Sequence, residues 1–196
     1  MNDLEDFRSQ QLMFIANAIT TRGLAVMSVG SGECSVPGCV CEPEPVPWSY
    51  TIGLVERRHP EVVTFGLPPK AAVAVLNWVH DRDIAGTRIE PGAIERFNGV
   101  PIKLVPVPAE WVTSDDDPMG QWFHHYRIGR ASIDPPPVLQ LLWADRHGVL
   151  PGEAGCERGV EEVQPRLLDR PRKVPRRLTA IQGGRGSRGR REPSRR

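Results

Sequence analysis

The C-terminal segment, residues 166–196, constrains the fold most, because its composition cannot build a core. It carries twelve Lys or Arg and two Asp or Glu, a net charge of +10, and Gly and Pro are frequent among the rest. Low hydrophobicity combined with like charge keeps such a segment unfolded. The remaining 13 basic and 22 acidic residues give residues 1–165 a net charge of −9. The chain is therefore predicted to be one acidic domain at 1–165, followed by a disordered basic tail at 166–196.

Within the body, three segments have the apolar spacing of amphipathic helices. Asn2 and Glu5 form a capping box at the start of the first. Pro68 and Pro69 begin the second, since proline suits the first turn of a helix. The predicted helices span about 2–22, 68–79 and 119–129.

Five segments are typical of strands, either because they alternate or because they are rich in β-branched residues. The predicted strands are Leu24–Val29, Trp48–Val55, Glu61–Gly66, Val100–Val107 and Val138–Trp143. The prolines of the fourth strand indicate an edge position. Hairpin connections outnumber βαβ units, so the predicted fold class is α+β: a single compact domain with a mostly antiparallel sheet covered by helices.

The amino terminus, 1–6, is acidic and lacks the basic start and apolar core of a signal peptide. No apolar run approaches the length of a membrane span. We therefore expect a cytoplasmic location, in which the four cysteines are reduced.

Three stretches together resemble a known family. They are Trp48-Ser49-Tyr50-Thr51-Ile52-Gly53-Leu54, His59-Pro60-Glu61-Val62, and Leu139-Gln140-Leu141-Leu142-Trp143-Ala144-Asp145 with Gly148. Their order and spacing resemble the bacterial domain of unknown function 4262 family. That family typically shows aromatic-Tyr-Thr-Ile-Gly-Leu, then His-Pro-Glu, then Leu-Gln-hydrophobic-hydrophobic-Trp-x-Asp-x-x-Gly.

The resemblance covers about residues 10–166, because Gln164-Pro165 is similar to the family's usual ending. This chain has Leu150-Pro151-Gly152 where the family commonly has Phe-Pro-Trp. Its cysteine-bearing loop also resembles an insertion between the first two strands. The resemblance implies a domain boundary and no reaction.

The cysteines suggest a metal site. Cys34, Cys39 and Cys41 lie within eight residues of one loop, and Cys156 or His59 could supply a fourth ligand for zinc. The spacing is not that of a standard zinc knuckle, however. A reduced, exposed cysteine cluster is the alternative.

Two polar pairs are candidates for acid–base catalysis. His59 with Glu61 follows a strand at a turn, and a carboxylate could orient the histidine as a general base. Asp145 with His147 flanks the turn after the last strand. For both pairs, a structural role in a turn is favoured over catalysis. Asp145 and Gly148 occupy the preferred positions of a type I turn, and Pro60 fixes the turn that contains His59.

Aromatic residues on several elements could line a cavity for a planar ligand such as flavin, on a fold like a flavin-reductase split barrel. The candidate cofactor-binding residues are Trp48, Tyr50, Gln140 and Trp143. Packing of the core is the alternative role for the tryptophans.

Three functions follow, in order of preference. The first is a non-catalytic binding or interaction domain with a small-ligand cavity. The second is an enzyme that uses His59 and Glu61, or Asp145 and His147, with a flavin as a cofactor on the split-barrel analogy. The third is weak, salt-sensitive binding of nucleic acid or another polyanion through 166–196, although an unselected extension explains that tail equally well.

Overall fold

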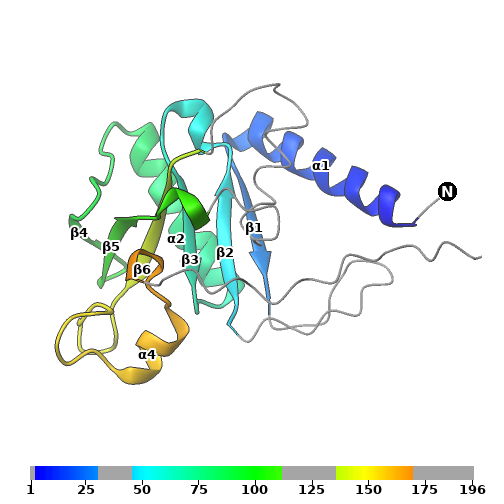
Figure 1. The fold of residues 1–196 in the computed structure, drawn as a ribbon. Helices are drawn as coiled ribbons and strands as arrows, with labels where there is room; N and C mark the ends of the chain where they lie inside the picture. The colour runs from blue at the N-terminus through cyan, green and yellow to red at the C-terminus, as the bar shows by residue number, and fades with distance from the viewer. Residues whose placement is uncertain (1–2, 31–45, 112–135, 170–196) are drawn as a thin grey trace, which may run out of the picture.

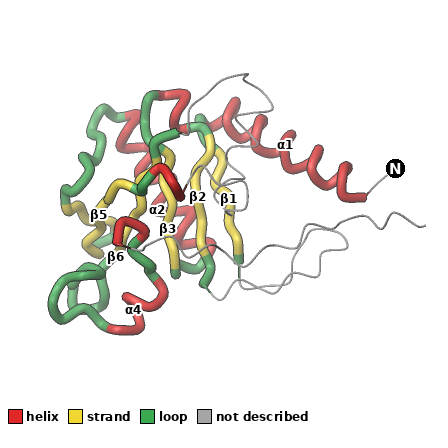
Figure 2. The backbone as a smooth tube through the Cα atoms, in the orientation of Figure 1, coloured by secondary structure: helices red, strands yellow, loops and turns green. Residues whose placement is uncertain are grey.

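The computed structural model describes residues 3–30, 46–111 and 136–169. It contains one sheet with the strand order β1-β2-β3-β6-β5-β4 (Figure 1). The strands are β1 Ala25–Val29, β2 Trp48–Ile52, β3 Glu61–Phe65, β4 Ile94–Phe97, β5 Val100–Pro106 and β6 Val138–Trp143. The helices are α1 Asp3–Arg22, α2 Pro69–Ile84 and α4 Arg158–Val163, with short 3-10 turns η1 Leu54–Arg57, η2 Ala109–Trp111 and η3 Leu167–Asp169 (Figure 2).

The predicted α+β class with a mostly antiparallel sheet is confirmed. Every neighbouring pair of strands is antiparallel except β3 and β6, which are parallel. The chain leaves β3, passes through α2 and the β4–β5 hairpin, and returns as β6 between β3 and β5. The predicted helix at 119–129, the cysteine loop and the tail beyond 169 lie outside the described residues.

Strand β5 corrects one prediction. It lies between β6 and β4, so the expectation that its prolines mark an edge is wrong. Pro101 and Pro106 lie next to or at its ends, where a missing N–H interrupts the ladder least. The edges of the sheet are β1 and β4, and no pairing joins them. The described strands therefore form an open sheet, and the split-barrel analogy is wrong for this part of the chain.

Helix α2 covers one face of the sheet. Its buried residues Val75, Leu76 and Val79 pack in one cluster with Val62 and Leu104 of the strands. Ala71, four residues before Val75, lies in the first turn of α2 and is exposed. The predicted start of this helix is confirmed: Pro68 is the capping residue and Pro69 the first helical one.

The opposite face is apolar and aromatic. Trp48, Tyr50 and Ile52 of β2 lie on it together, as the alternation predicted, and Ile15 and Ala18 of α1 pack against them. Trp48 stacks on Tyr50 at a centroid distance of 5.0 Å and on Phe65 at 6.1 Å. Only the C-terminal part of α1 takes part, and the rest projects away from the sheet (Figure 1).

Strand β2 ends three residues earlier than predicted. The prediction ran to Val55, but Gly53 adopts φ 117° and η1 follows at once. This backbone conformation turns the chain out of the sheet. The side chain of Leu54 is fully buried, in the cluster beneath α2.

The C-terminal segment is attached to β6 by two glutamine side chains. Gln164 accepts a hydrogen bond from the Trp143 N–H at 2.9 Å and donates one to the Trp143 carbonyl at 2.8 Å. Gln140 donates to the Pro165 carbonyl at 2.8 Å and accepts from the Leu167 N–H at 2.9 Å. Leu167 is buried, so packed structure continues two residues past the predicted domain end.

Candidate functional site

His59 lies at the turn before β3, and its side chain is 1% exposed. Nδ1 lies 2.5 Å from the Pro60 carbonyl, which can only accept, so Nδ1 carries the proton. Burial lowers the pKa of His59, partly opposed by the bond to Pro60 and by the charge of Asp83; nearby Arg88 and His80 lower it further. The ring is therefore neutral near pH 7.

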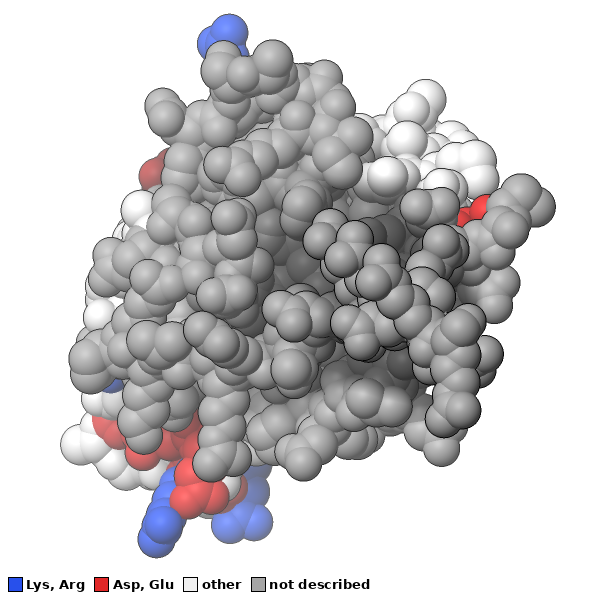
Figure 3. All heavy atoms as spheres, turned by 45° about the vertical axis from the view of Figure 1, so that its right-hand side comes forward, with Lys and Arg blue, Asp and Glu red and all other residues white. Residues whose placement is uncertain are grey.

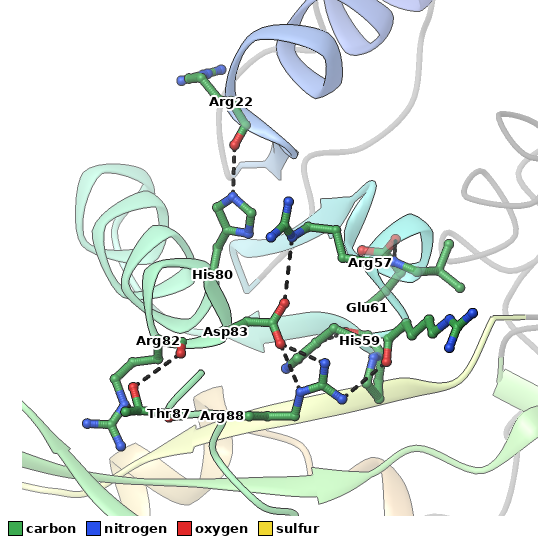
Figure 4. Close-up of polar contacts among 12 residues, drawn as sticks. Arg22, Arg57, His59, Glu61, His80, Arg82, Asp83, Thr87 and Arg88 are labelled. Carbon is green, nitrogen blue, oxygen red and sulfur yellow. Dashed lines mark hydrogen bonds and ion pairs between the residues drawn. The ribbon is translucent and has the colours of Figure 1, made fainter. Parts of the chain in front are cut away.

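A polar cluster surrounds His59 at the C-terminal end of α2 (Figure 4). The Asp83 carboxylate, 6% exposed, lies 2.7 Å from a terminal nitrogen of Arg88 and 3.8 Å from Nε of Arg57. Arg88 also donates to the Arg58 carbonyl at 3.2 Å. These contacts link η1 to the loop after α2. The cluster therefore stabilises the position of these two loops relative to each other.

His80 extends this cluster to α1. Its Nε2 donates to the Arg22 carbonyl at 2.8 Å, at the end of α1, where carbonyl groups lack helical partners. Gly23, with φ 84°, allows this approach, since a Cβ there would lie 2.9 Å from the His80 ring. His80 is 3% exposed, and its Nδ1 has no hydrogen-bond partner. The ring is therefore placed as a cap for α1.

We expect the burial of His59 to make the domain less stable in acid. Because the pKa of His59 is lower in the folded state, the unfolded chain binds this proton first as the pH falls below about 6.5. The stability is complete above that pH and is lost as the pH falls through the folded pKa, with a slope of at most about 1.4 kcal/mol per pH unit. Urea unfolding of wild type and His59→Gln between pH 7.5 and 5 measures this term.

The difference in the free energy of unfolding between wild type and His59→Gln should narrow steadily toward acid pH, since the other histidines contribute equally to both proteins. His147→Gln is the matched control, because the His147 side chain is 62% exposed. Its difference from wild type should be nearly constant. A His59→Gln difference that is also constant would show that His59 titrates alike in both states.

The Glu61 carboxylate is fully buried at the start of β3. Oε2 accepts the Thr51 hydroxyl at 2.6 Å, and Oε1 accepts the N–H groups of Gly53 at 2.8 Å and Val55 at 3.3 Å. Thr51 in turn accepts the Val62 N–H at 2.8 Å. The carboxylate thus satisfies the backbone of the turn between β2 and η1, while His59 Nδ1 is directed at Pro60.

Asp145 occupies the turn after β6. Oδ1 accepts the N–H groups of His147 at 2.8 Å and Val149 at 2.9 Å, and Oδ2 accepts that of Glu157 at 2.9 Å. The Gly148 N–H donates to the Asp145 carbonyl at 3.0 Å, as expected for the predicted turn. These backbone bonds, the one from Val149 first, lower the pKa of Asp145. His147 points outward and lies 3.3 Å from Glu157.

The two candidate pairs lie at opposite ends of the sheet. Strands β3 and β6 are parallel, with Glu61 opposite Val138. His59 precedes β3, whereas Asp145 follows β6. Six residues of strand at about 3.3 Å each put about 20 Å between these ends. His59 and Asp145 therefore do not form a joint site.

The four candidate cofactor-binding residues do not line one space. Trp48 and Tyr50 are buried in the cluster on the α1 side, and burial raises the pKa of Tyr50 to about 12. Gln140 bonds the C-terminal segment. Trp143 packs against the cluster on the α2 side, and its indole N–H donates to the Phe65 carbonyl at 2.9 Å.

Trp143 instead lines a cavity of about 360 Å³ between α2, the β4–β5 hairpin and the end of β6. This volume falls within the range of small-molecule sites, roughly 300–1,000 Å³. The walls are almost entirely apolar, with polar groups at 98, 145 and 146. The lining residues are Leu67, Ala71, Val75, Phe97, Asn98, Val100, Ile102, Leu141, Trp143, Ala144, Asp145 and Arg146.

The candidate zinc ligands are only partly placed. Cys34, Cys39 and Cys41 lie outside the described residues, so zinc there stays a prediction. Cys156 and His59 lie inside them, and no three described His, Cys, Asp or Glu side chains are grouped to hold a metal. Burial raises the pKa of the Cys156 thiol, and Asp145, Glu161, Glu157 and Glu153 add to this effect.

A model of one protein family matches residues 18–157 of the chain, and its description is "Domain of unknown function (DUF4262)". The chain belongs to this family. The match confirms the resemblance seen in the three sequence stretches. No curated protein and no solved structure matches the chain. Within 3–30, 46–111 and 136–169, no helix is long and apolar enough to cross a membrane.

In this DUF4262 domain, the polar side chains that carried the resemblance bond to backbone groups. Glu61 satisfies the turn after β2, Asp145 the turn after β6, and Gln140 the segment that returns along the sheet. Trp143 reaches the Phe65 carbonyl. These side chains all stabilise the fold through hydrogen bonds to the backbone, which explains why they occur in the three stretches.

Sequence patterns missed most of the cavity. Of its lining, only Trp143 and Asp145 were candidates, because the cavity forms where α2, the hairpin and β6 meet. The hairpin turns at Asn98-Gly99, a residue pair typical of tight hairpin turns. The cluster around Asp83 was also missed, since its arginines come from separate loops.

Proposed function

We propose that this DUF4262 domain is a non-catalytic binding domain that takes an uncharged, largely apolar small ligand in the cavity beside α2. The cavity itself carries the proposal, because its volume suits a small ligand and its walls are almost entirely apolar. Two aromatic side chains, Phe97 and Trp143, lie in the wall and offer flat surfaces to such a ligand.

The candidate catalytic side chains support this choice over an enzyme. A general base must reach its substrate with an acceptor that is available. The carboxylates of Glu61 and Asp145 each accept three hydrogen bonds from the chain itself. The His59 ring is almost completely enclosed. Polyanion binding through 166–196 is an alternative that rests on the sequence alone.

We expect the neutral fluorescent probe N-phenyl-1-naphthylamine to bind the full-length protein in the low micromolar range, because transfer of its rings from water is favourable. Ala71→Trp should weaken this binding at least about tenfold, a loss of about 1.4 kcal/mol. Ala71 is an exposed helical residue that lines the cavity, so a larger side chain fills the opening without disturbing the core. Probe titration followed by fluorescence measures both.

Ala16→Trp is the matched control, since Ala16 is also exposed and helical but belongs to α1. It should bind the probe as wild type does. Equal loss in both variants, or no saturable binding to wild type, would rule out a ligand site in the cavity.

A further inference from the structure

The outer side of β4 carries free backbone groups. Strand β4 lies at the margin of the molecule, and among the described strands it pairs only with β5 (Figure 1). Arg96 lies opposite Pro101, whose carbonyl accepts the Ala144 N–H at 2.9 Å on the β6 side. Opposed residues of an antiparallel pair alternate between hydrogen-bonded and non-hydrogen-bonded, so Ile94 and Arg96 direct their N–H and C=O groups away from β5. We call these four backbone groups the outer edge of β4.

Aromatic side chains lie beside the outer edge, on the face of the sheet that α2 covers. Phe97 of β4 packs against Trp78 of α2 at a centroid distance of 5.5 Å, and both rings are half-buried. The Arg82 guanidinium lies 5.5 Å from the centre of the Trp78 ring and pairs with Glu95 of β4 at 3.4 Å. Aromatic and arginine side chains are enriched where proteins bind partners. This face therefore offers an added strand apolar surface, and its own charges are already paired.

The other face of β4 is apolar and basic. Side chains alternate along a strand, so Ile94 and Arg96 lie on the face away from Glu95 and Phe97. Ile94 is 58% exposed. Lys103 of β5 is in register with Ile94 and shares its face. In the part of the chain that the structure describes, no carboxylate pairs with Arg96 or Lys103. An added strand would therefore meet cations that lack carboxylate partners.

We propose that the outer edge of β4 binds an extended segment of another protein as an added strand. Main-chain hydrogen bonds to Ile94 and Arg96 supply affinity in such a complex, and alternate side chains supply specificity. The apolar side chains of the segment contact Trp78 and Phe97. Its acidic side chains face Arg96 and Lys103. This interaction adds a protein partner to the domain and does not depend on a ligand in the cavity.

A second copy of this chain fits the outer edge poorly. A two-fold antiparallel pair that uses the backbone of both Ile94 and Arg96 must place Ile94 of each copy opposite Arg96 of the other. This register brings Glu95 opposite the same residue of the second copy, with Cα atoms about 4.5 Å apart. Like charges directly opposite each other are destabilising. The partner is therefore a different protein, with carboxylates on one face of its strand only.

A short capped peptide in which valine alternates with glutamate is the probe, and fluorescence anisotropy with the full-length protein measures its binding. Wild type should bind the peptide saturably. Ile94→Pro should weaken binding at least about fivefold, because proline removes an outward N–H but no hydrogen bond to β5. Ile94→Ala is the matched control, since it shortens the same exposed side chain and keeps the N–H. It should bind within about twofold of wild type.

A charge exchange tests the chemistry of the partner. Arg96→Glu should weaken binding of the glutamate peptide at least about tenfold, because attraction becomes repulsion. The same variant should bind a peptide with lysine in place of glutamate more tightly than wild type does. Arg158→Glu changes the net charge equally, but Arg158 is 90% exposed on α4, at the lower end of the molecule, where charged side chains of both signs gather (Figure 3). It should bind both peptides as wild type does.

The proposal stands if Ile94→Pro and Arg96→Glu lose the glutamate peptide while both controls keep it, with unchanged circular dichroism. Absence of saturable binding to wild type overturns it. Equal binding by wild type, Ile94→Pro and Arg96→Glu overturns it too, since the peptide would then bind elsewhere, such as the basic segment 166–196, which all variants share.

Discussion

Glu61→Ala is expected to lower the free energy of unfolding by about 4 kcal/mol, because each buried donor that loses its acceptor costs about 1–3 kcal/mol. The Thr51 hydroxyl and the N–H groups of Gly53 and Val55 all lose theirs. For a domain of this size the midpoint temperature should fall by about 10 °C. Urea and thermal unfolding, followed by circular dichroism, measure both quantities.

Two further variants distinguish the loss of the hydrogen bonds to the Glu61 carboxylate from a nonspecific loss of stability. Glu61→Gln keeps one oxygen for the two N–H groups but turns an NH2 group toward Thr51, so about half of the loss should remain. Glu162→Ala removes a glutamate that is 61% exposed and pairs with Arg158 on the surface of α4. It should cost less than about 0.5 kcal/mol. A Glu61→Ala loss as small as that of Glu162→Ala would contradict the buried network.

Gly53→Ala is expected to cost about 3 kcal/mol, the sum of backbone strain and overpacking. Gly53 adopts φ 117°, which L side chains rarely take. A Cβ there would lie 2.9 Å from Ile19 Cγ1, 3.1 Å from the Gly23 carbonyl and 3.3 Å from Leu24 Cα. Two of these neighbours are backbone atoms, so they cannot move aside at small cost. Urea unfolding of the variant provides the measurement.

The control for Gly53 is a glycine with positive φ but open surroundings. Gly99 has φ 84°, and a Cβ there would meet no atom within 4 Å. Gly99→Ala should therefore show the backbone strain alone, about 1 kcal/mol. Similar losses in the two variants would mean that the contacts of Gly53 with α1 and with Gly23 and Leu24 after it are not tight.

Most helices and strands within the described residues could be predicted because each has a local signal, but β4 and α4 were not predicted. The alternation of Trp48, Tyr50 and Ile52 placed them on one face, and the prolines at 68 and 69 marked the start of α2. Strand order could not be predicted in this way. Neither β3 nor β6 contains a local mark that the two are parallel neighbours, since that pairing follows from how the whole core packs.

In the candidate site, too, only the features with a local sequence signal could be predicted. Asp145 and Gly148 were expected to serve a turn, because four adjacent residues define it, and their hydrogen bond confirms it. The roles of Glu61 and Gln140 needed partners six to twenty-seven residues away, which no motif specifies. A buried carboxylate that fastens a turn and one that performs chemistry have the same sequence, and only their contacts distinguish them.

The position of β6 has a consequence for synthesis on the ribosome. Among the described strands, β1, β2 and β3 form one half of the sheet, β5 and β4 form the other, and β6 joins the two halves. Until residues 138–143 have left the exit tunnel, the nascent chain exposes the open edges of β3 and β5, both flanked by apolar side chains. Such edges attract other strands. The domain therefore completes its sheet only after β6 has emerged, and truncation before Val138 leaves two incomplete halves that are prone to aggregate.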